Sequence, residues 1–298
     1  MTRCLATLLS VLAVFCVWGD TRPSSSGGST PDAFRALVTR LAGVSYSDNV
    51  TVGDYVYASS GDSAQVLAAK YAAFTDASRP IGGRRTLYTP GNHELVGTSA
   101  TLHDGYVAAL GTHDPYVAYA RAWRGAAIAY VHLPSEGQGH NGTVGYYGED
   151  DARNSAEAVW LVSTLRANRA AAVFVFMHHP VYDPKPSDPW AGSAEPARLD
   201  ALFAKYGVDA VFAGHLHYYR RHRSPSGVTY VTQGMGGAPP YAATYAPLDA
   251  YDKASWGSPW AASYTEVTVY RKAAYCASWR MDAAGVWEQA DTFTLWLL

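Results

Sequence analysis

Several apolar segments of this chain end in side chains that can bind metal ions. Residues 89–94 (TPGNHE) and 214–217 (GHLH) each follow a stretch typical of a β-strand, and the apolar run 173–177 ends in His178 and His179. Two metal ions roughly 3.5–4 Å apart need ligands that converge from separate parts of the chain. Imidazole and carboxylate groups suit zinc, iron and manganese. These clusters therefore predict a two-metal site at the ends of neighbouring strands.

Two Gly-Asp turns can supply the carboxylates that such a site requires. An anion between the ions is needed to keep two cations close together. The apolar run 14–18 leads to Gly19 and Asp20, and the run 50–52 leads to Gly53 and Asp54. A third Gly-Asp pair ends in Asp62 but follows two serines instead of a strand, so nothing rigid would aim its carboxylate. We therefore expect Asp20 and Asp54 to be ligands and Asp62 not to be one.

In chain order these motifs are GD, GDxxY, GNHE, a histidine after an apolar strand, and GHxH. The ordered set resembles the calcineurin-like metallophosphoesterase superfamily, and most of all its purple acid phosphatase branch. The match runs from about Trp18 to Gly237, and five ordered motifs are far more specific than any one of them. The resemblance implies an α/β fold in which a two-sheet β-sandwich is flanked by helices on both sides, in four α/β/β/α layers. It also implies hydrolysis of phosphate esters by a metal-bound hydroxide.

The resemblance further implies a role for each motif residue, with Asp54 bridging the two ions. The implied ligands of the first ion are Asp20, Asp54, Tyr57 and His217. The implied ligands of the second ion are Asp54, Asn92, His178 and His215. His93 is implied to be catalytic, since it would point to the substrate and donate to the leaving-group oxygen or steady the phosphate. Other substrate-binding residues stay unassigned.

Adjacent His178 and His179 cannot both be ligands, because successive side chains of an extended chain point to opposite faces. We assign His178, because in the family that the motifs resemble the ligand is the first polar residue after the apolar strand. His179 is left with two interpretations, as a residue that lines the substrate pocket or as a histidine that supports the ligands from behind.

The first motif departs from the commonest pattern of the superfamily. Many members begin with Asp-x-His, but this chain has Asp20-Thr21-Arg22, and a guanidinium cannot bind a metal ion. Tyr57, three residues after Asp54, resembles the phenolate by which purple acid phosphatases bind ferric iron. A trivalent ion favours an anionic oxygen and can deprotonate a phenol whose usual pKa is roughly 10. The alternative is that Tyr57 is one of 22 tyrosines and only packs.

Other polar residues receive structural interpretations. A lone histidine is more often structural or solvated than a ligand, and this group comprises His103, His113, His132, His140 and His222. Five arginines could attract a phosphate dianion, although solvated charge is the preferred interpretation for most: Arg84, Arg85, Arg220, Arg221 and Arg223. The Gly-rich segment 234–239 lacks the Lys-Ser/Thr of a P-loop. It resembles the family's loop near the site, and the alternative is a tight turn that requires positive φ.

Length and charge agree with one catalytic domain over residues 1–298, since the motifs span the chain and leave no obvious boundary. The net charge of -2 argues against a nucleic-acid partner. The expected partner is a small-molecule phosphate ester, and the oligomeric state stays open. Helices are expected at about 31–42 (with Thr30 as cap and Pro31 in the first turn), 66–74, 155–168 and 197–206. Strands are expected at 229–233, 263–270, 275–281 and 291–297.

The N-terminal segment allows two interpretations. Residues 1–18 have one positive charge before an apolar stretch, as in a signal peptide, yet the end of this stretch must form the strand that delivers Asp20. We expect residues 14–18 to be that strand and leave residues 1–13 open between a signal-like segment and part of the domain. The stretch is too short for a membrane span. An extracytoplasmic or secreted location is favoured, with a cytoplasmic one left open.

Two further patterns say little about location. Three cysteines give no disulfide framework. The glycosylation sequons at Asn49 and Asn141 are too common to locate the protein on their own.

The sequence therefore predicts a purple acid phosphatase-like phosphoesterase with two metal ions, iron paired with iron, zinc or manganese. A phosphodiesterase of the same superfamily is one alternative. A non-catalytic relative that serves as a binding module is another, and it would usually have lost ligands. A mononuclear zinc hydrolase needs only about three protein ligands, which leaves Asp20, Asp54 and Tyr57 unexplained.

Overall fold

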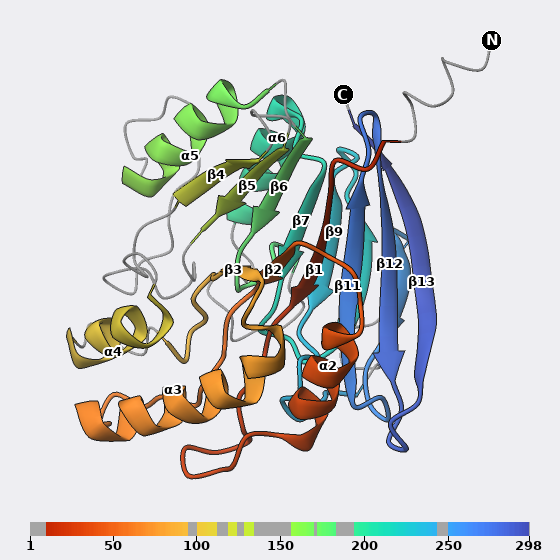
Figure 1. The fold of residues 1–298 in the computed structure, drawn as a ribbon. Coiled ribbons are helices and arrows are strands. Elements are labelled where there is room, and N and C mark those ends of the chain that lie inside the picture. The colour runs from red at the N-terminus through yellow and green to blue at the C-terminus, as the bar shows by residue number, and fades with distance from the viewer. Residues whose placement is uncertain are drawn as a thin grey trace.

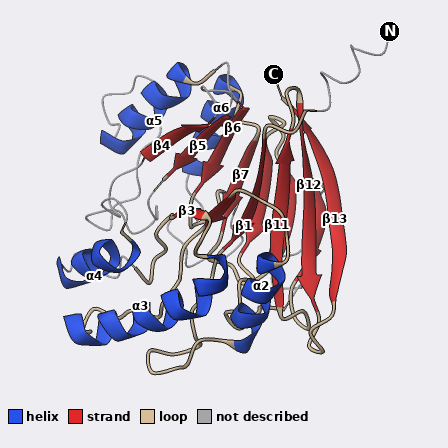
Figure 2. Ribbon diagram, in the orientation of Figure 1, coloured by secondary structure: helices blue, strands red, loops and turns tan. Residues whose placement is uncertain are grey.

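The computed structural model describes residues 10–94, 100–111, 119–123, 128–133, 156–169, 172–182, 194–242 and 250–297. Two β-sheets form the centre of the fold, and helices lie outside them (Figures 1 and 2). The first sheet has the order β13-β12-β11-β1-β2-β3 and the second has the order β10-β8-β9-β7-β6-β5-β4. The fold is therefore the two-sheet sandwich that the motifs imply.

The strands of the first sheet are β1 (Ala13–Trp18), β2 (Asp48–Thr51), β3 (Arg85–Leu87), β11 (Ala262–Val269), β12 (Ala273–Met281) and β13 (Trp287–Trp296). The strands of the second sheet are β4 (Tyr119–Trp123), β5 (Ile128–His132), β6 (Ala172–Phe176), β7 (Ala210–Ala213), β8 (Tyr219–Arg223), β9 (Thr229–Gln233) and β10 (Asp252–Trp256). The helices are α2 (Asp32–Ala42), α3 (Ala64–Ser78), α4 (Ala100–Leu110), α5 (Ala156–Ala167) and α6 (Glu195–Tyr206), and a 3₁₀ turn η1 (Arg79–Ile81) follows α3.

Aromatic side chains fill the space between the sheets. The ring of Phe15 on β1 meets Phe174 and Phe176 on β6 edge-on, with centroid separations of 5.3 and 6.1 Å. Such edge-to-face pairs stabilise a core beyond the area that they bury. Phe176 also stacks on Phe212 of β7. These contacts fix the two sheets face to face.

The outer face of each sheet is covered by a separate group of helices. Trp18 on β1 packs with Phe34 of α2, which stacks on Phe74 of α3, and α3 and α4 pack against each other. On the other side, apolar residues of α5 and α6, such as Leu161 and Phe203, pack on β6 and β7. Figure 1 shows the two groups on opposite sides of the sandwich. The predicted α/β/β/α layering is confirmed.

The direction of the strands decides where their carboxyl ends meet. β1, β2 and β3 pair in parallel, as do β5, β6, β7 and β9 in the second sheet. In open sheets with parallel strands, ligands bind beyond the carboxyl ends of the strands. The segments after β1, β2, β3, β6 and β7 carry the five predicted motifs. The fold therefore places all five motifs at one edge of the sandwich.

Most of the expected helices and strands are confirmed, with shifts of a few residues at their ends. One end differs for a physical reason: α2 begins at Asp32, and its N-cap is Pro31, which has no side-chain capping bond. The expectation that Thr30 caps this helix and that Pro31 lies in its first turn is therefore wrong. Pro31 is extended, with φ -61° and ψ 139°, which proline readily adopts.

The arginine-rich segment after the GHLH motif forms strand β8 and does not face solvent as a whole. Arg220 is buried and makes a bidentate ion pair with Asp252 at 2.6 and 2.8 Å. Arg221 pairs with Asp291 in the same way, at 2.6 and 3.0 Å. Solvated charge is therefore the wrong interpretation for Arg220. These pairs engage the guanidinium groups in holding strands together.

Within the part of the chain that the structure describes, no helix is long and apolar enough to cross a membrane. Cys16 and Cys276 are buried and free, and Cys4 lies outside the described residues. Asn49 is also buried and accepts hydrogen bonds from Trp18 and Tyr46, so its sequon is not exposed for glycosylation. The second sequon, at Asn141, lies outside the described residues.

Candidate metal centre

Three of the predicted ligands have a backbone conformation that residues other than glycine rarely adopt. The φ angles of Asp20, Asp54 and His215 are 56°, 58° and 67°. Each such residue costs of order 1–3 kcal/mol, and such residues cluster at functional sites. Each directly follows the glycine of its motif. The chain therefore turns sharply after three strands to direct these side chains toward a common point.

The glycines of these motifs allow the ligand loops to touch one another. Gly53 has a φ of 94°, and a Cβ atom at this position would lie 2.6 Å from both the backbone nitrogen of Gly91 and Nδ1 of His178. A Cβ atom on Gly91 would collide with the carboxylate of Asp54. Only glycine fits where two backbones approach so closely. The Gly-Asp and Gly-Asn motifs thus require glycine because the loops that carry them are in contact and leave no room for a side chain.

The four ligands predicted for the second ion lie close together. Oδ1 of Asn92 is 2.9 Å from Nε2 of His178 and 3.0 Å from Nδ1 of His215. Oδ1 of Asp54 is 3.4 Å from the same Nε2 of His178. We call these four residues, from four separate loops, the second-ion group.

His178 is held in the tautomer that a metal ligand needs. Its Nδ1 donates to the carbonyl oxygen of Val52 at 2.7 Å, which leaves the lone pair of Nε2 pointing at Asn92 and Asp54. Burial lowers the pKa of His178 to about 4, so the ring is neutral at neutral pH. In this orientation a neutral Nε2 faces the Oδ1 of Asn92 with lone pair toward lone pair. Such converging acceptors are stabilised by a cation between them, so the donor set fits a metal ion.

Three of the four ligands predicted for the first ion also converge. One donor atom from each of Asp20, Asp54 and His217 lies within 4.8 Å of the other two, and all three residues are buried. Nδ1 of His217 donates to the carbonyl oxygen of Pro239 at 2.8 Å, which leaves Nε2 free to accept. Burial, together with the charge of Arg22, lowers the pKa of His217 to about 3. We call Asp20, Asp54 and His217 the first-ion group.

The two buried carboxylates influence each other strongly. Burial and the charge of Asp54 raise the pKa of Asp20. Burial alone would raise the pKa of Asp54 too, but its interactions with His178, with His93 and with the guanidinium of Arg22 lower it well below its usual range. Uncompensated like charges at short distance are costly in a buried site. The negative charge at the centre of the site is thus carried by Asp54, the residue predicted to bridge the ions.

Tyr57, the fourth ligand predicted for the first ion, lies beside this group. Its ring centroid is 5.0 Å from Cζ of Arg22 and 4.3 Å from the ring of His93. Arg22 in turn donates from Nε to Oδ2 of Asp54 at 3.0 Å. Tyr57 therefore belongs to the wall of the site, and its role as a phenolate ligand stays a prediction.

His93 lies next to Asp54 but outside both donor groups. Its Nε2 is 4.0 Å from Oδ2 of Asp54, and its backbone nitrogen donates to Oδ1 of Asp54 at 3.0 Å. Its side chain is 14% exposed, compared with 0% for His178 and 3% for His217. Burial lowers the pKa of His93. Its greater exposure is consistent with the predicted role on the substrate.

His179 lies directly behind a predicted ligand. Its ring centroid is 4.1 Å from that of His215 and 5.3 Å from that of His178. The residue is 4% exposed. Of the two interpretations left open, the one in which His179 supports the ligands agrees better with this burial.

Glu94, which follows His93, is a residue whose role the sequence analysis missed. Its buried carboxylate accepts hydrogen bonds from the backbone nitrogens of Gly91 and Asp54 at 2.8 Å each, and of Tyr55 at 2.9 Å and Val56 at 3.3 Å. Burial and the charge of Asp54 raise its pKa, while these N–H groups act in the opposite direction. Glu94 therefore ties the loop of Asp54 to the loop of Asn92. The acidic residue in the GNHE motif was the available signal.

Replacement of Glu94 by alanine is expected to destabilise the protein and weaken metal binding. The change leaves four buried backbone N–H groups without their acceptor, and each unsatisfied group costs about 1–3 kcal/mol. We expect a loss of at least about 3 kcal/mol in the free energy of unfolding, measured in urea. Glu94→Gln keeps one side-chain oxygen, so its free energy of unfolding should lie between those of Glu94→Ala and wild type. A free energy of unfolding that is unchanged in Glu94→Ala would contradict this role.

The residues expected to lie outside the site are mostly engaged elsewhere. Asp62 pairs with Lys70 at 2.6 Å and accepts from the backbone nitrogen of Ser59, which agrees with its exclusion. His103 pairs with Asp104, His132 hydrogen-bonds Thr89, and His222 hydrogen-bonds Asp252. His113 and His140 lie outside the described residues. Arg85 pairs with Asp48, Arg84 donates to the carbonyl oxygen of Val44, and Arg223 is exposed.

The Gly-rich segment 234–239 packs against the loop that carries Asp20. The backbone nitrogen of Ala238 donates to the carbonyl oxygen of Asp20 at 2.8 Å. A Cβ atom on Gly236 would collide with the carbonyl oxygen of Gly19. The segment therefore lies near the site, as the resemblance implies. Close backbone approach accounts for Gly236, and Gly237 has a positive φ of 139°, as the alternative requires.

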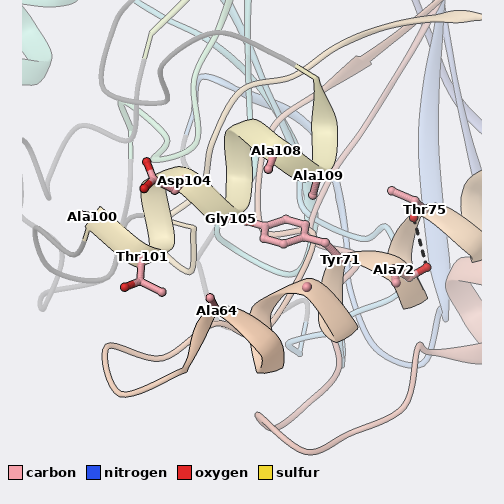
Figure 3. A pocket seen from close by; sticks show the side chains of 11 residues that line it. Ala64, Tyr71, Ala72, Thr75, Ala100, Thr101, Asp104, Gly105, Ala108 and Ala109 are labelled. Atoms are coloured by element: carbon pink, nitrogen blue, oxygen red, sulfur yellow. Dashed lines mark hydrogen bonds between the residues drawn. The ribbon is translucent and has the colours of Figure 1, made fainter.

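A cavity of about 600 Å³ lies elsewhere, between α3 and α4 (Figure 3). Small side chains line much of it, including Ala64, Ala72 and Ala108, together with the ring of Tyr71 and with Asp104. None of the predicted ligands is among its lining residues. The cavity therefore shares no lining residue with the predicted ligands and is separate from the metal centre.

Comparison with known proteins agrees with this fold. A family model described as calcineurin-like phosphoesterase matches residues 15–219, the segment from β1 to the start of β8. This protein belongs to the calcineurin-like phosphoesterase family.

The more specific similarities are distant. "Purple acid phosphatase 1" of Ipomoea batatas is 25% identical over 161 residues, which cover 51% of this chain and 32% of the relative. The structure of purple acid phosphatase PPD1 from yellow lupin (Lupinus luteus) seeds aligns with a TM-score of 0.67 at 15% identity, covering 96% of this chain and 54% of the lupin protein. A dimetal phosphatase from Danio rerio aligns with a TM-score of 0.57 at 13% identity, and the alignment covers 97% of this chain and 100% of the Danio rerio chain. The chain thus spans about a third of the curated relative, and the two structures establish likeness of fold alone.

Proposed function

We propose that this protein hydrolyses phosphate esters with the help of two metal ions, in the manner of a purple acid phosphatase. The observation that carries this proposal is the position of Asp54 between two donor groups. Its Oδ1 faces His178 of the second-ion group at 3.4 Å. Its carboxylate also converges with Asp20 and His217 in the first-ion group. A single carboxylate shared by two sets of neutral and anionic donors is what a pair of cations needs.

The residues fit this cofactor in number and in chemistry. Asp20, Asp54, His217 and Tyr57 would hold the first ion, and Asp54, Asn92, His178 and His215 would hold the second. Histidines that are neutral and oriented through their second ring nitrogen are the form that binds metals. Iron paired with iron, zinc or manganese would suit these oxygen and nitrogen donors. Bound cations would supply Lewis acidity that activates water and neutralises phosphate charge.

The remaining work falls to side chains of the protein. His93, the more exposed histidine beside Asp54, is placed to donate a proton to the oxygen of the departing alcohol or to hold the phosphate. Glu94 keeps the loops of Asp54 and Asn92 at a fixed separation. The positive-φ turns aim Asp20, Asp54 and His215 toward the centre of the site.

Elemental analysis tests this proposal. The purified protein is first equilibrated with excess Zn²⁺, Mn²⁺ or iron and then freed of unbound metal. Two ions per chain, together with release of phosphate from esters, would agree with it. One ion would favour a mononuclear hydrolase. No bound ion would favour a non-catalytic relative that acts as a binding module. A phosphodiesterase would bind two ions but prefer diester over monoester substrates.

Tyr57 decides how closely the protein follows the purple acid phosphatases. In the branch that the motifs resemble, a tyrosinate bound to ferric iron absorbs visible light. We expect iron-loaded protein to be pink to purple and Tyr57→Phe to lose this absorption, because the change removes only the phenolic oxygen. The exposed Tyr275 on β12 offers a control, and Tyr275→Phe should keep the colour. Colourless iron-loaded wild type, or colour that persists in Tyr57→Phe, would exclude the phenolate ligand.

A further inference from the structure

Arg22 occupies a position among the donors of the first-ion group. Its Nε donates to Oδ2 of Asp54 at 3.0 Å, and one terminal nitrogen lies 3.5 Å from Nε2 of His217. The other terminal nitrogen donates to the carbonyl oxygen of Pro23 at 3.2 Å. The side chain is only 13% exposed. The guanidinium is therefore fixed in place by atoms that a metal ion would use.

The contact with His217 involves one particular lone pair. Nδ1 of His217 carries the ring proton and donates to Pro239, so Nε2 can only accept. In the structure this Nε2 faces the guanidinium of Arg22. A metal ion bound by His217 would take the same lone pair. The ion and the guanidinium therefore compete for one acceptor on His217 and for one oxygen on Asp54.

The second-ion group differs in this respect. Its donor atoms on Asn92, His178 and His215 approach one another at 2.9 and 3.0 Å, and it shares with Arg22 only the carboxylate of Asp54. That carboxylate presents Oδ1 to His178 and Oδ2 to Arg22. The guanidinium thus neutralises Asp54 from the side of the first ion, whereas Oδ1 on the side of the second ion faces His178 and accepts from the backbone nitrogen of His93.

We propose, on the basis of the two-metal function above, that Arg22 is an internal competitor of the first metal ion. The second-ion group fills first and tightly. The first ion binds more weakly, because it must displace a guanidinium that cannot lose its charge at accessible pH. The cost is a fixed positive charge close to an incoming cation. Metal loading is therefore sequential, and the occupancy of the first position depends on metal concentration.

A calorimetric titration tests this proposal. Chelator-stripped protein is titrated with Zn²⁺ in the presence of a competing chelator. Wild type should show two binding steps whose affinities differ by at least about tenfold, as expected for repulsion between charges a few ångströms apart. Arg22→Ala should strengthen the weaker step by at least about tenfold and leave the tighter step within about threefold. Arg22→His, which restores an imidazole at this position, should strengthen the weaker step at least as much.

Three further variants assign the steps and control for lost charge. Asn92→Ala should remove the tighter step, and Asp20→Ala should remove the weaker one. Arg35→Ala removes an exposed arginine of α2 and should leave both steps unchanged. Arg22→Gln provides a neutral substitute of similar length if Arg22→Ala does not fold, as judged by circular dichroism.

The outcomes separate this proposal from the proposed function. Two steps whose affinities are equal in wild type, or unchanged in Arg22→Ala and Arg22→His, would overturn the role of Arg22 while leaving the two-metal site in place. A wild type that binds one ion beside an Arg22→Ala variant that binds two would support the role of Arg22 and would argue against a mononuclear hydrolase. Failure of wild type, Arg22→Ala and Arg22→His alike to bind a second ion at any concentration would overturn both proposals.

Discussion

Replacement of Asp54 by asparagine is expected to abolish hydrolysis of phosphate esters and to lower metal content. Asp54 contributes to both donor groups, and neighbouring positive charges keep its pKa below the usual range. Asparagine has nearly the same shape but no charge, so it cannot balance two cations. Loss of several kcal/mol of transition-state stabilisation corresponds to a fall in kcat of at least about a thousandfold. The measurement is kcat together with metal content for each variant.

Asp62 is the matched control for this change. It lies in another Gly-Asp pair of the same region but pairs with Lys70. Asp62→Asn should keep two ions and should change kcat by less than about tenfold, as for a residue outside the catalytic machinery. Near-normal turnover with two ions bound in Asp54→Asn would show that the bridging carboxylate is another residue.

Replacement of His93 by alanine should lower turnover strongly while both ions stay bound. The imidazole lies 4.0 Å from Asp54 and outside both donor groups, and the backbone bond from residue 93 to Asp54 survives the change. General acid catalysis is typically worth about 10²–10⁴-fold. The loss should approach this range for alkyl phosphates, whose leaving group needs a proton, and should be much smaller for p-nitrophenyl phosphate.

The ratio of these two losses separates the roles left open for His93. A loss that is equal for alkyl and nitrophenyl esters would exclude proton donation and would favour a role in holding the phosphate. His103, which is partly exposed and pairs with Asp104, is the matched control. His103→Ala should leave both turnover numbers unchanged.

The residues that meet at the candidate metal centre could be predicted from the sequence because their geometry is local. A strand followed by Gly-Asp, Gly-Asn or Gly-His places a ligand at the edge of a sheet wherever the strand lies within it. The structure brings Asp20, Asp54 and His217 into one group, and Asn92 with His178 and His215 into the other. Parallel pairing then makes the strand ends meet. The sequence motifs thus predict most of the residues that meet at the candidate site.

Other features depend on distant parts of the chain and could not be read from local pattern. The sequence of β8 (YRRHR) has low strand character by hydrophobicity, and it forms a strand because Asp252 and Asp291 neutralise its arginines. Tertiary contacts of this kind override intrinsic preference. Helix α4, which the sequence analysis did not predict and which contains Gly105, packs against α3.

The contacts of two polar residues were likewise hidden. Glu94 is the last residue of the GNHE motif, but three of its four backbone donors lie on a loop some 40 positions earlier. In the sequence, Arg22 stands where many members of the superfamily have a histidine ligand, so the sequence indicates only that this ligand is missing. Only the fold shows that its guanidinium reaches Asp54 and His217.

The most direct test of metal-dependent phosphoester hydrolysis uses chelator-stripped protein, before and after Fe, Zn²⁺ or Mn²⁺ is restored, and follows phosphate release from monoesters and alcohol release from diesters. The metal-free protein should hydrolyse neither class of ester. Hydrolysis should return on addition of at least one of these metals in wild type, and should not return in Asp54→Asn. Failure of the folded, metal-loaded wild type to hydrolyse any ester would contradict the proposed function, as would hydrolysis by the stripped protein or by Asp54→Asn at the rate of the metal-loaded wild type.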